Sequence, residues 1–415
     1  MRARFWIGIA LAAVVASCAG EDAGERSLRG DGRTAAQARA EGIAKDLILV
    51  DTHIDLPYRL NKRMEDVSQP TAKGDFDYDR ARAGGLNVAF MSIYVPAAHQ
   101  ESGDAKQVAD DLIDMVEGLV ADHPDKFALV TKAAEVRHRL RDVRIGFALG
   151  MENGAGIAGR LENLQHFYER GVRYITLAHS KSNRIADSSY DENRQWNGLS
   201  PFGREVVAEM NRLGMMIDVS HITDEASDEV LELSTAPAIA SHSSCRSFTP
   251  GWERNMGDEM IRKLAAKGGV IQINFGSMFL DDEYRLRHEE LWERLEAELA
   301  EAGIEPDSDH ADQYGERFFA ENPLEPVDVA VVADHIDHVV ELVGIDHVGL
   351  GSDFDGVGDN LPRGLEDVSA YPNLIRVLLE RGYEIGDVAK ICGGNLFRVW
   401  TEVERIAGEM QAAGS

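Results

Sequence analysis

Several apolar runs along this chain end abruptly in a single histidine or acidic residue, and this feature constrains the fold more than any other. The first run is LILVDTHIDLP over residues 47–57, where Pro57 stops a hydrogen-bonded strand from continuing. Successive side chains of a strand alternate faces, so His53 and Asp55 project the same way. Such a pair is either half of a metal site or a buried hydrogen-bonded pair, and this stretch alone leaves both open.

The same ending recurs in five later runs. These runs end in Glu152 (GFALGME), His179 (VRYITLAH), His221 (MMIDVSH), His242 (PAIASH) and Asp353 (HVGLGSD). A core strand has no packing reason to finish on a residue that binds metal, and the repetition makes chance less plausible. The pattern predicts that the carboxyl ends of the strands converge on one polar site.

Eight runs have the length of strands, and helical segments separate most of them. The strands are expected at 47–57, 87–95, 144–152, 172–179, 215–220, 237–241, 270–275 and 347–352, and the helices at 105–120, 161–170, 202–213, 224–233, 258–267 and 329–343. This alternation predicts an α/β fold, a (β/α)8 TIM-type barrel, whose catalytic residues lie at strand carboxyl ends. An open doubly wound sheet is the alternative, but no Gly-rich phosphate loop follows a strand.

One connection is much longer than the others. Residues 281–325, between the seventh and eighth strands, form a charged helical insertion that either walls the active-site face or is a solvated decoration or oligomer contact. Two further helices are expected at 374–381 and 385–403, the second interrupted by Gly393 and Gly394.

The amino terminus has the features of an export signal. Arg2 and Arg4 precede a short apolar stretch, and residues 15–18 (VASC) resemble a bacterial lipobox. We expect a lipoprotein signal peptide at 1–17, a flexible tether at 18–42 and one catalytic domain at 43–415. The protein would then be exported to the periplasmic side or cell envelope and lipid-anchored through Cys18. An ordinary secretory signal is the alternative.

Charge and cysteine content exclude several classes of partner and site. The net charge of −29 argues against a nucleic-acid partner, since phosphate binding needs a basic surface. Beyond Cys18 only Cys245 and Cys392 remain, so at most one disulfide is possible and no cysteine zinc motif exists. A metal site must therefore rely on histidine and carboxylate ligands, which suit zinc or a similar divalent ion.

The strand-end residues exceed what one tetrahedral ion needs, which suggests two ions. Glu152 is the natural bridge, because it is the only glutamate in the set and can reach both ions. One ion would take His53 and Asp55, and the other His221 and His242. A hydroxide held between the ions would attack a carbonyl or phosphorus centre.

At this point the motifs resemble a known family. DTHIDLP, GMENG, LAHS, DVSH, SHSS, ERNMGD and GSDFDGV, followed by GLEDVSAYPNL, are similar to the membrane (renal) dipeptidases of the amidohydrolase superfamily, in order from about residue 47 to 404. The resemblance implies a barrel with two zinc ions, bound by the ligands named above, that cleaves L,L and L,D dipeptides. A homodimer is also expected from the family.

The resemblance implies roles for three further residues. Asp353 matches the family's proton-shuttling carboxylate, His179 the histidine that steadies the scissile carbonyl, and Arg254 the arginine that holds the substrate's free carboxylate. Each has a competing interpretation: His179 could be a core histidine, Arg246 could replace Arg254, and Asp355 could share the role of Asp353.

The chain also departs from the family pattern. Relatives often carry a tyrosine shortly after the seventh strand, whereas residues 276–279 here read GSMF. His335, His338 and His347 are expected to be structural. Other reactions of the same metal pair, such as lactam or lactone opening or deacylation, remain as alternatives, as does a barrel retained as a binding protein after loss of catalysis.

Overall fold

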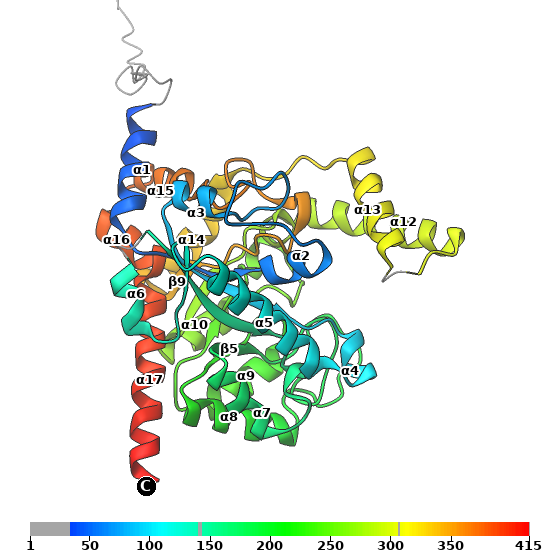
Figure 1. Cartoon of the computed structure of the whole chain (residues 1–415), viewed down its shortest axis with the longest axis vertical. Helices are drawn as coiled ribbons and strands as arrows, with labels where there is room; N and C mark the ends of the chain where they lie inside the picture. The colour runs from blue at the N-terminus through cyan, green and yellow to red at the C-terminus, as the bar shows by residue number, and fades with distance from the viewer. Residues whose placement is uncertain (1–33, 140–142, 306–307, 415) are drawn as a thin grey trace, which may run out of the picture.

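The computed structural model describes residues 34–139, 143–305 and 308–414, and in them a parallel sheet is surrounded by helices (Figure 1). The strands are β1 (Leu49–Ile54), β2 (Leu86–Tyr94), β3 (Phe127–Leu129), β4 (Ile145–Glu152), β5 (Val172–Thr176), β6 (Met216–Asp218), β7 (Ile239–Ala240), β8 (Val270–Ile273) and β9 (Val348–Leu350). Their order is β1-β2-β4-β5-β6-β7-β8-β9, with β3 paired only to β4.

Contacts between the first and last strands of this order nearly close the barrel. The backbone N–H of Asp55 donates to the Phe354 carbonyl at 2.8 Å, and that of Asp353 donates to the His53 carbonyl at 3.0 Å. A parallel bridge joins Ile54 to Phe354. The eight strands therefore form the predicted (β/α)8 barrel, and their carboxyl ends meet at one rim.

Helices cover the outside of the barrel. They are α1 (Ala35–Asp46), α2 (Leu56–Lys62), α3 (Tyr78–Gly84), α4 (Ala98–Ser102), α5 (Ala105–Asp122), α6 (Ala133–Arg139), α7 (Leu161–Glu169), α8 (Pro201–Leu213), α9 (Asp224–Leu233), α10 (Asp258–Ala266), α11 (Ser277–Leu280), α12 (Asp282–Ala302), α13 (Asp309–Glu321), α14 (Val329–Val343), α15 (Tyr371–Glu380), α16 (Ile385–Ala389) and α17 (Asn395–Ala413). Local signals set their ends: in α8 the Ser200 hydroxyl accepts from the Gly203 N–H, and Gly214 ends the helix with φ of 85°.

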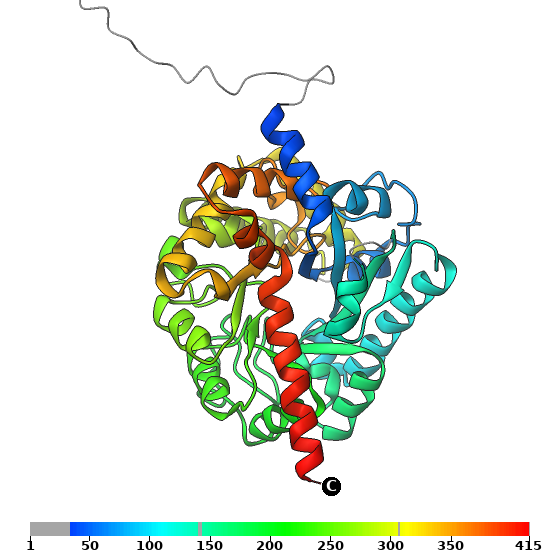
Figure 2. The same ribbon diagram turned by 90° about the vertical axis from the view of Figure 1, so that its left-hand side faces the viewer.

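The barrel interior is filled with side chains and plugged at the amino-terminal end. Inward-facing residues such as Phe90 and Tyr174 form one buried cluster with Trp400 of α17. The ring centroids of Phe90 and Trp400 lie 5.4 Å apart, and Figure 2 shows α17 lying across the front of the barrel in that view. The plugged end leaves the opposite rim, at the strand carboxyl ends, as the place for a site.

Two segments differ from the sequence-based expectation. Strand β3 was not predicted, because three residues are too few to display a period; it adds to the edge of β4 through Phe127–Ile145 pairing. The predicted tether is wrong for residues 35–42, which belong to α1. Thr34 caps α1, and the burial of Ala40, Ile43 and Ala44 holds the helix against the domain. These mostly small residues give the sequence no obvious amphipathic pattern.

The insertion between β8 and α14 forms helices α12 and α13, as expected. Figure 1 shows both helices (yellow) projecting away from the barrel. They bury a small cluster of their own, which includes Leu295 and Phe318. The base of α12 contacts the rim, where the Tyr284 hydroxyl donates to Asn360 at 2.5 Å, and Glu316 of α13 pairs with the exposed Lys73 at 3.6 Å. The distal part of the insertion therefore fits a solvated decoration or an oligomer contact better than a wall over the active-site face.

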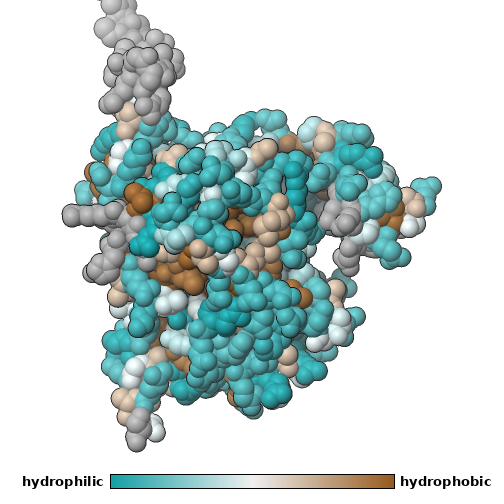
Figure 3. All heavy atoms as spheres, in the orientation of Figure 1, coloured by the Kyte–Doolittle hydropathy of each residue, from teal (hydrophilic) through white to brown (hydrophobic). Residues whose placement is uncertain are grey.

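The surface is mainly polar, as the face drawn in Figure 3 illustrates, with apolar residues in small patches. Within residues 34–139, 143–305 and 308–414, no helix is both long and apolar enough to cross a membrane. The predicted signal peptide, Cys18 and tether residues up to 33 lie outside the described part of the chain.

Candidate metal centre

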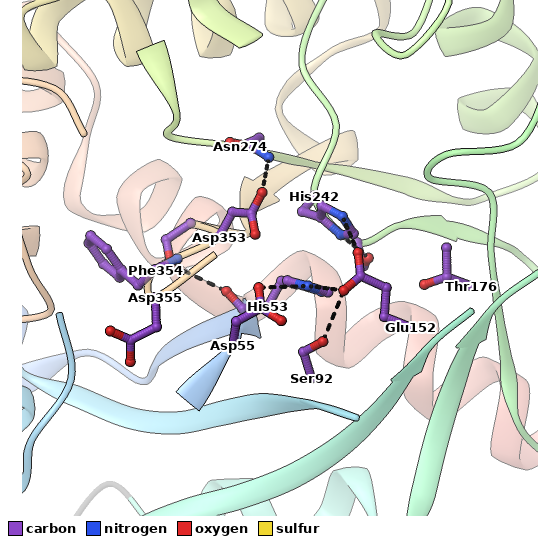
Figure 4. Close-up of polar contacts among 12 residues, drawn as sticks. His53, Asp55, Ser92, Glu152, Thr176, His242, Asn274, Asp353, Phe354 and Asp355 are labelled. Carbon is purple, nitrogen blue, oxygen red and sulfur yellow. Dashed lines mark hydrogen bonds and ion pairs between the residues drawn. The ribbon is translucent and has the colours of Figure 1, made fainter. Parts of the chain in front are cut away.

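All the predicted strand-end residues gather at the carboxyl-terminal rim. Glu152 ends β4, and Asp55 stands at the junction where β1 gives way to α2. The others follow their strands within a few residues: His179 after β5, His221 after β6, His242 after β7 and Asp353 after β9. Figure 4 shows His53, Asp55, Glu152, His242 and Asp353 turned toward one another. The sequence-based convergence is therefore confirmed.

Glu152 lies at the centre of the cluster, and its two carboxylate oxygens face different partners. Oε2 lies 3.3 Å from His53 Nε2 and accepts a hydrogen bond from the Ser92 hydroxyl at 3.1 Å. Oε1 lies 3.1 Å from His221 Nε2, 3.2 Å from His242 Nε2 and 3.3 Å from His179 Nε2. One buried carboxylate therefore serves two groups of imidazoles.

Three overlapping groups have their ligand atoms within 4.8 Å of one another, a spacing that would suit a metal ion. They are His53 with Glu152 and His242, Glu152 with His179 and His221, and His53 with Asp55 and Asp353. Each combines imidazole or carboxylate donors of the kind that zinc accepts. The third group contains the predicted pair His53 and Asp55. The predicted partners His221 and His242 fall in different groups, His242 with His53 and His221 with His179.

Hydroxyl groups behind two histidines orient them. The Tyr174 hydroxyl lies 2.8 Å from His53 Nδ1 and donates to the Thr52 carbonyl at 2.9 Å. The Ser241 hydroxyl lies 2.7 Å from His242 Nδ1 and 2.6 Å from Asp218 Oδ2. These contacts leave both Nε2 atoms directed at Glu152, which is how outer partners aim metal-ligating imidazoles.

Sequence reasoning missed this outer layer, although one signal was present. Tyr174 and Thr176 alternate inward along β5, and room for the Tyr174 ring requires a glycine opposite. A Cβ added to Gly150 would lie 2.0 Å from the Tyr174 ring. The glycine in GFALGME thus serves the packing of the ring that orients His53.

Burial and charge set the protonation of the cluster. Burial followed by the charge of His53 lowers the pKa of His242 to about 4. Burial and then Arg254 lower the pKa of His221 well below its usual value. Burial raises the pKa of Glu152, but the nearby His53 and His179 outweigh it and hold that pKa well below the usual range. Two neutral imidazoles and an anionic carboxylate are ready ligands at neutral pH.

Asp353, not Asp355, faces the cluster. Asp353 Oδ2 accepts a hydrogen bond from the Asn274 amide at 2.7 Å, and burial raises the pKa of its carboxyl. Asp355 turns away, as Figure 4 shows, and pairs with Arg59 at 3.0 Å. The alternative that Asp355 shares the role of Asp353 is therefore not supported, because its charge is already engaged outside the site.

Close packing brings the two aspartates of the cluster together. A Cβ added to Gly356 would lie 2.3 Å from Asp55 Oδ2 and 2.4 Å from Asp353 Oδ1. The backbone φ angles of His221 and Asp353 are 68° and 66°. Such left-handed conformations cost about 1–3 kcal/mol each and are concentrated at functional sites.

Arg254 lies at the cluster, whereas its competitor Arg246 does not. The Arg254 side chain is buried, donating to the Ser243 hydroxyl at 3.0 Å and to the His242 carbonyl at 2.8 Å. Among the described residues, no carboxylate lies within ion-pair distance of it. Arg246 instead pairs with both oxygens of Asp224, at 2.6 and 2.7 Å. A buried guanidinium without an acidic partner is poised to receive an anion.

The three histidines expected to be structural make contacts away from the cluster, and both internal cysteines are buried. The Cys245 N–H donates to His335 Nδ1 at 3.1 Å, and His335 Nε2 lies 3.0 Å from the Leu280 carbonyl. His338 pairs with Asp258 at 2.8 Å. His347 Nδ1 lies 2.8 Å from the Gly269 carbonyl. Cys245 and Cys392 are buried and free of one another, so the optional disulfide does not form.

Comparisons with known sequences point to one family. A family model described as membrane dipeptidase (peptidase family M19) matches residues 37–414. An uncharacterized dipeptidase of Schizosaccharomyces pombe is 33% identical over 384 residues, which cover 89% of this chain and 84% of that protein. The dipeptidase aclJ of Aspergillus oryzae is 34% identical over 341 residues, which cover 80% and 71%.

Solved structures agree. The probable dipeptidase PvdM from Pseudomonas aeruginosa superposes with a TM-score of 0.76 at 26% identity, covering 89% of this chain and 99% of that one. A metallo peptidase from Rhodobacter sphaeroides, liganded with a phosphinate mimic of the dipeptide L-Ala-D-Ala, superposes with a TM-score of 0.70 at 25% identity, covering 86% and 99%.

Proposed function

As a member of the membrane dipeptidase family, peptidase family M19, this chain is a metallo-dipeptidase, and we propose that it cleaves free L,L and L,D dipeptides with two bound zinc ions. The observation that carries the two-ion proposal is the division of Glu152 between two imidazole groups. His53 faces one carboxylate oxygen, and His221 and His242 face the other. A bridging carboxylate needs this arrangement.

The donor set fits such ions. His53 Nε2 and Asp55 Oδ1 are buried polar atoms without a hydrogen-bond partner, which costs free energy unless another group satisfies them. His53 and Asp55 would hold one ion and His221 and His242 the other, with Glu152 shared. When bound, the pair would polarise the scissile carbonyl and lower the pKa of the attacking water that it holds.

The chain's own residues would then handle the proton and the carbonyl. Asp353 would accept the proton of the attacking water and pass it to the leaving amine, a task that suits a buried carboxyl whose pKa is raised. His179 Nε2 lies 3.3 Å from Glu152 and faces the same space, so it would donate to the carbonyl oxygen as negative charge develops there.

Arg254 supports a substrate with a free carboxylate. Its buried guanidinium has no acidic partner among the described residues, and a planar two-donor fork matches a carboxylate. Support for activity on L,D dipeptides comes from the similar Rhodobacter sphaeroides metallo peptidase, whose ligand mimics L-Ala-D-Ala. Export and lipid anchoring through Cys18 are proposed from the amino-terminal sequence alone.

Metal content and substrate range test the proposal directly. We expect about two zinc ions per chain, because Glu152 would be shared between two ions. We also expect cleavage of L,L and L,D dipeptides, because Arg254 would bind their free carboxylate. Metal analysis and product assays would use an N-acetylated dipeptide and a lactone as controls. Two metals with turnover of the lactone alone would favour another amidohydrolase reaction, and absence of metal would refute the site.

Metal binding should release a proton and tighten as pH rises. Burial lowers the pKa of His53, but Tyr174, Glu152 and Asp55 around it raise that pKa well above its usual value. The metal-free protein therefore keeps a proton on His53 at pH 7, and zinc must displace it. Calorimetry in buffers of different ionisation enthalpy should detect about one released proton per chain at pH 7. An enthalpy independent of the buffer would contradict this assignment.

A further inference from the structure

A tyrosine outside the proposed ligand set lies at the Arg254 side of the site. Tyr190 belongs to the segment after β5, and its ring centroid lies 5.7 Å from that of His221 and 6.2 Å from that of Trp252. Trp252 in turn stacks on Phe279 at 5.3 Å, and the Arg254 guanidinium lies 5.1 Å from the Phe279 ring centroid. Three aromatic rings thus share one corner of the site with a guanidinium that has no acidic partner among the described residues.

Backbone hydrogen bonds fix Tyr190 at this corner. An antiparallel bridge joins Ser188 to Ile222, and the Ser189 N–H donates to the His221 carbonyl at 2.7 Å. The Tyr190 N–H donates to the Ser188 hydroxyl at 3.1 Å. The segment is therefore attached to the loop that presents a proposed metal ligand, so the position of the Tyr190 ring does not depend on its own contacts alone.

An ion pair joins the Tyr190 segment to the Arg254 segment. Arg194 lies 2.5 Å from Glu253, the residue just before Arg254. The other oxygen of Glu253 accepts from the Asp224 N–H at 3.0 Å, which anchors it to the start of α9. Because both segments are held by the same carboxylate, Tyr190 and Arg254 keep their relative positions.

The Tyr190 residue is 39% exposed, while its hydroxyl is surrounded by enough protein to be partly desolvated. Burial raises the pKa of this hydroxyl to about 12, and the positive charge of Arg254 opposes the rise. The hydroxyl therefore stays protonated at neutral pH. Arginine only donates hydrogen bonds, so the Tyr190 proton remains available to a third group that sits between the two side chains.

Resting on the dipeptidase function proposed above, we propose that Tyr190 binds substrate by donating a hydrogen bond to the free carboxylate held by Arg254. One carboxylate oxygen would face the guanidinium and the other the phenol, so the corner would recognise a carboxylate by two different donors. A hydrogen bond to a charged group should change affinity roughly ten- to hundredfold.

The Tyr190→Phe variant isolates the hydroxyl, because it keeps the ring and its contacts. The zinc-loaded full chain would be titrated calorimetrically with a phosphinate dipeptide mimic that has a free carboxylate and with its carboxyl-terminal amide. We expect Kd for the acid and KM for dipeptides to rise at least about tenfold, with kcat and the Kd of the amide close to wild type. Tyr383→Phe, which loses a hydroxyl bonded to Asp337 at 2.6 Å away from the site, serves as the matched control.

The outcomes separate this inference from the proposed function. If wild type prefers the acid mimic and Tyr190→Phe binds it equally well, Tyr190 does not bind the carboxylate. If both mimics weaken equally in the variant, the hydroxyl supports the pocket as a whole and the proposal is also overturned. If wild type neither binds the mimics nor cleaves dipeptides, the proposed function fails and this inference fails with it.

Discussion

Replacing Glu152 by glutamine is expected to remove dipeptidase activity and most of the bound metal. Glutamine keeps the size of the side chain but lacks the charge, and only one of its two terminal atoms can act as a ligand. Because each oxygen of Glu152 faces a different group of histidines, both groups lose their shared anion at once. Loss of several kcal/mol of transition-state stabilisation corresponds to a fall in kcat/KM of roughly 10³-fold or more.

Metal analysis of the purified variant and kcat/KM on one dipeptide would measure this effect. Glu316→Gln is the matched control, since that side chain is 72% exposed on α13, outside the cluster. Circular dichroism would establish that the metal-free variant still folds. A Glu152→Gln protein with wild-type metal content and activity would refute the proposal that Glu152 bridges two metal ions.

The Arg254→Met variant should lose affinity for dipeptides while it keeps its metal. Methionine fills a similar apolar volume against Phe279 but cannot bind a carboxylate. Hydrogen bonds to charged groups contribute about 1.5–3 kcal/mol each, so KM should rise roughly 100-fold for free dipeptides. The carboxyl-terminal amide of a phosphinate mimic lacks the charge, and its Kd should therefore change far less than that of the acid.

Arg246→Met provides the control for this variant. Arg246 lies in the same loop region of the sequence as Arg254, but its guanidinium forms an ion pair with Asp224. Arg246 also donates to the Asn255 carbonyl at 2.7 Å, next to Arg254, so its replacement should lower thermal stability and raise KM far less than Arg254→Met does. Equal KM values for wild type and Arg254→Met would show that the free carboxylate is recognised elsewhere and would favour uncharged substrates.

Much of the fold follows from patterns that are local in the sequence. Apolar runs that end in histidine or acid mark strands and their carboxyl ends, and caps such as Ser200 and Gly214 mark helix limits. In a parallel barrel all strand ends meet at one rim. The convergence of His53, Glu152 and Asp353 could therefore be predicted without knowing any distance.

Other features escaped prediction because they are too short or too weakly patterned. Strand β3 has three residues, and α1 buries mostly alanines, so neither shows a clear period. The tether was consequently predicted to extend too far. The insertion at 281–325 was recognised as helical, but its direction depends on how α12 and α13 pack on each other, as the Leu295 and Phe318 cluster illustrates.

The sequence by itself determined the barrel, the rim on which the site lies and the histidines and carboxylates that compose it. Only the tertiary structure decided which of two similar candidates faces the cluster. Arg246 forms an ion pair with Asp224, and Asp355 forms one with Arg59. Arg254 and Asp353 instead face the cluster. The physical reason is that a charge is available to a ligand only when no neighbour neutralises it, and those neighbours come from distant parts of the chain.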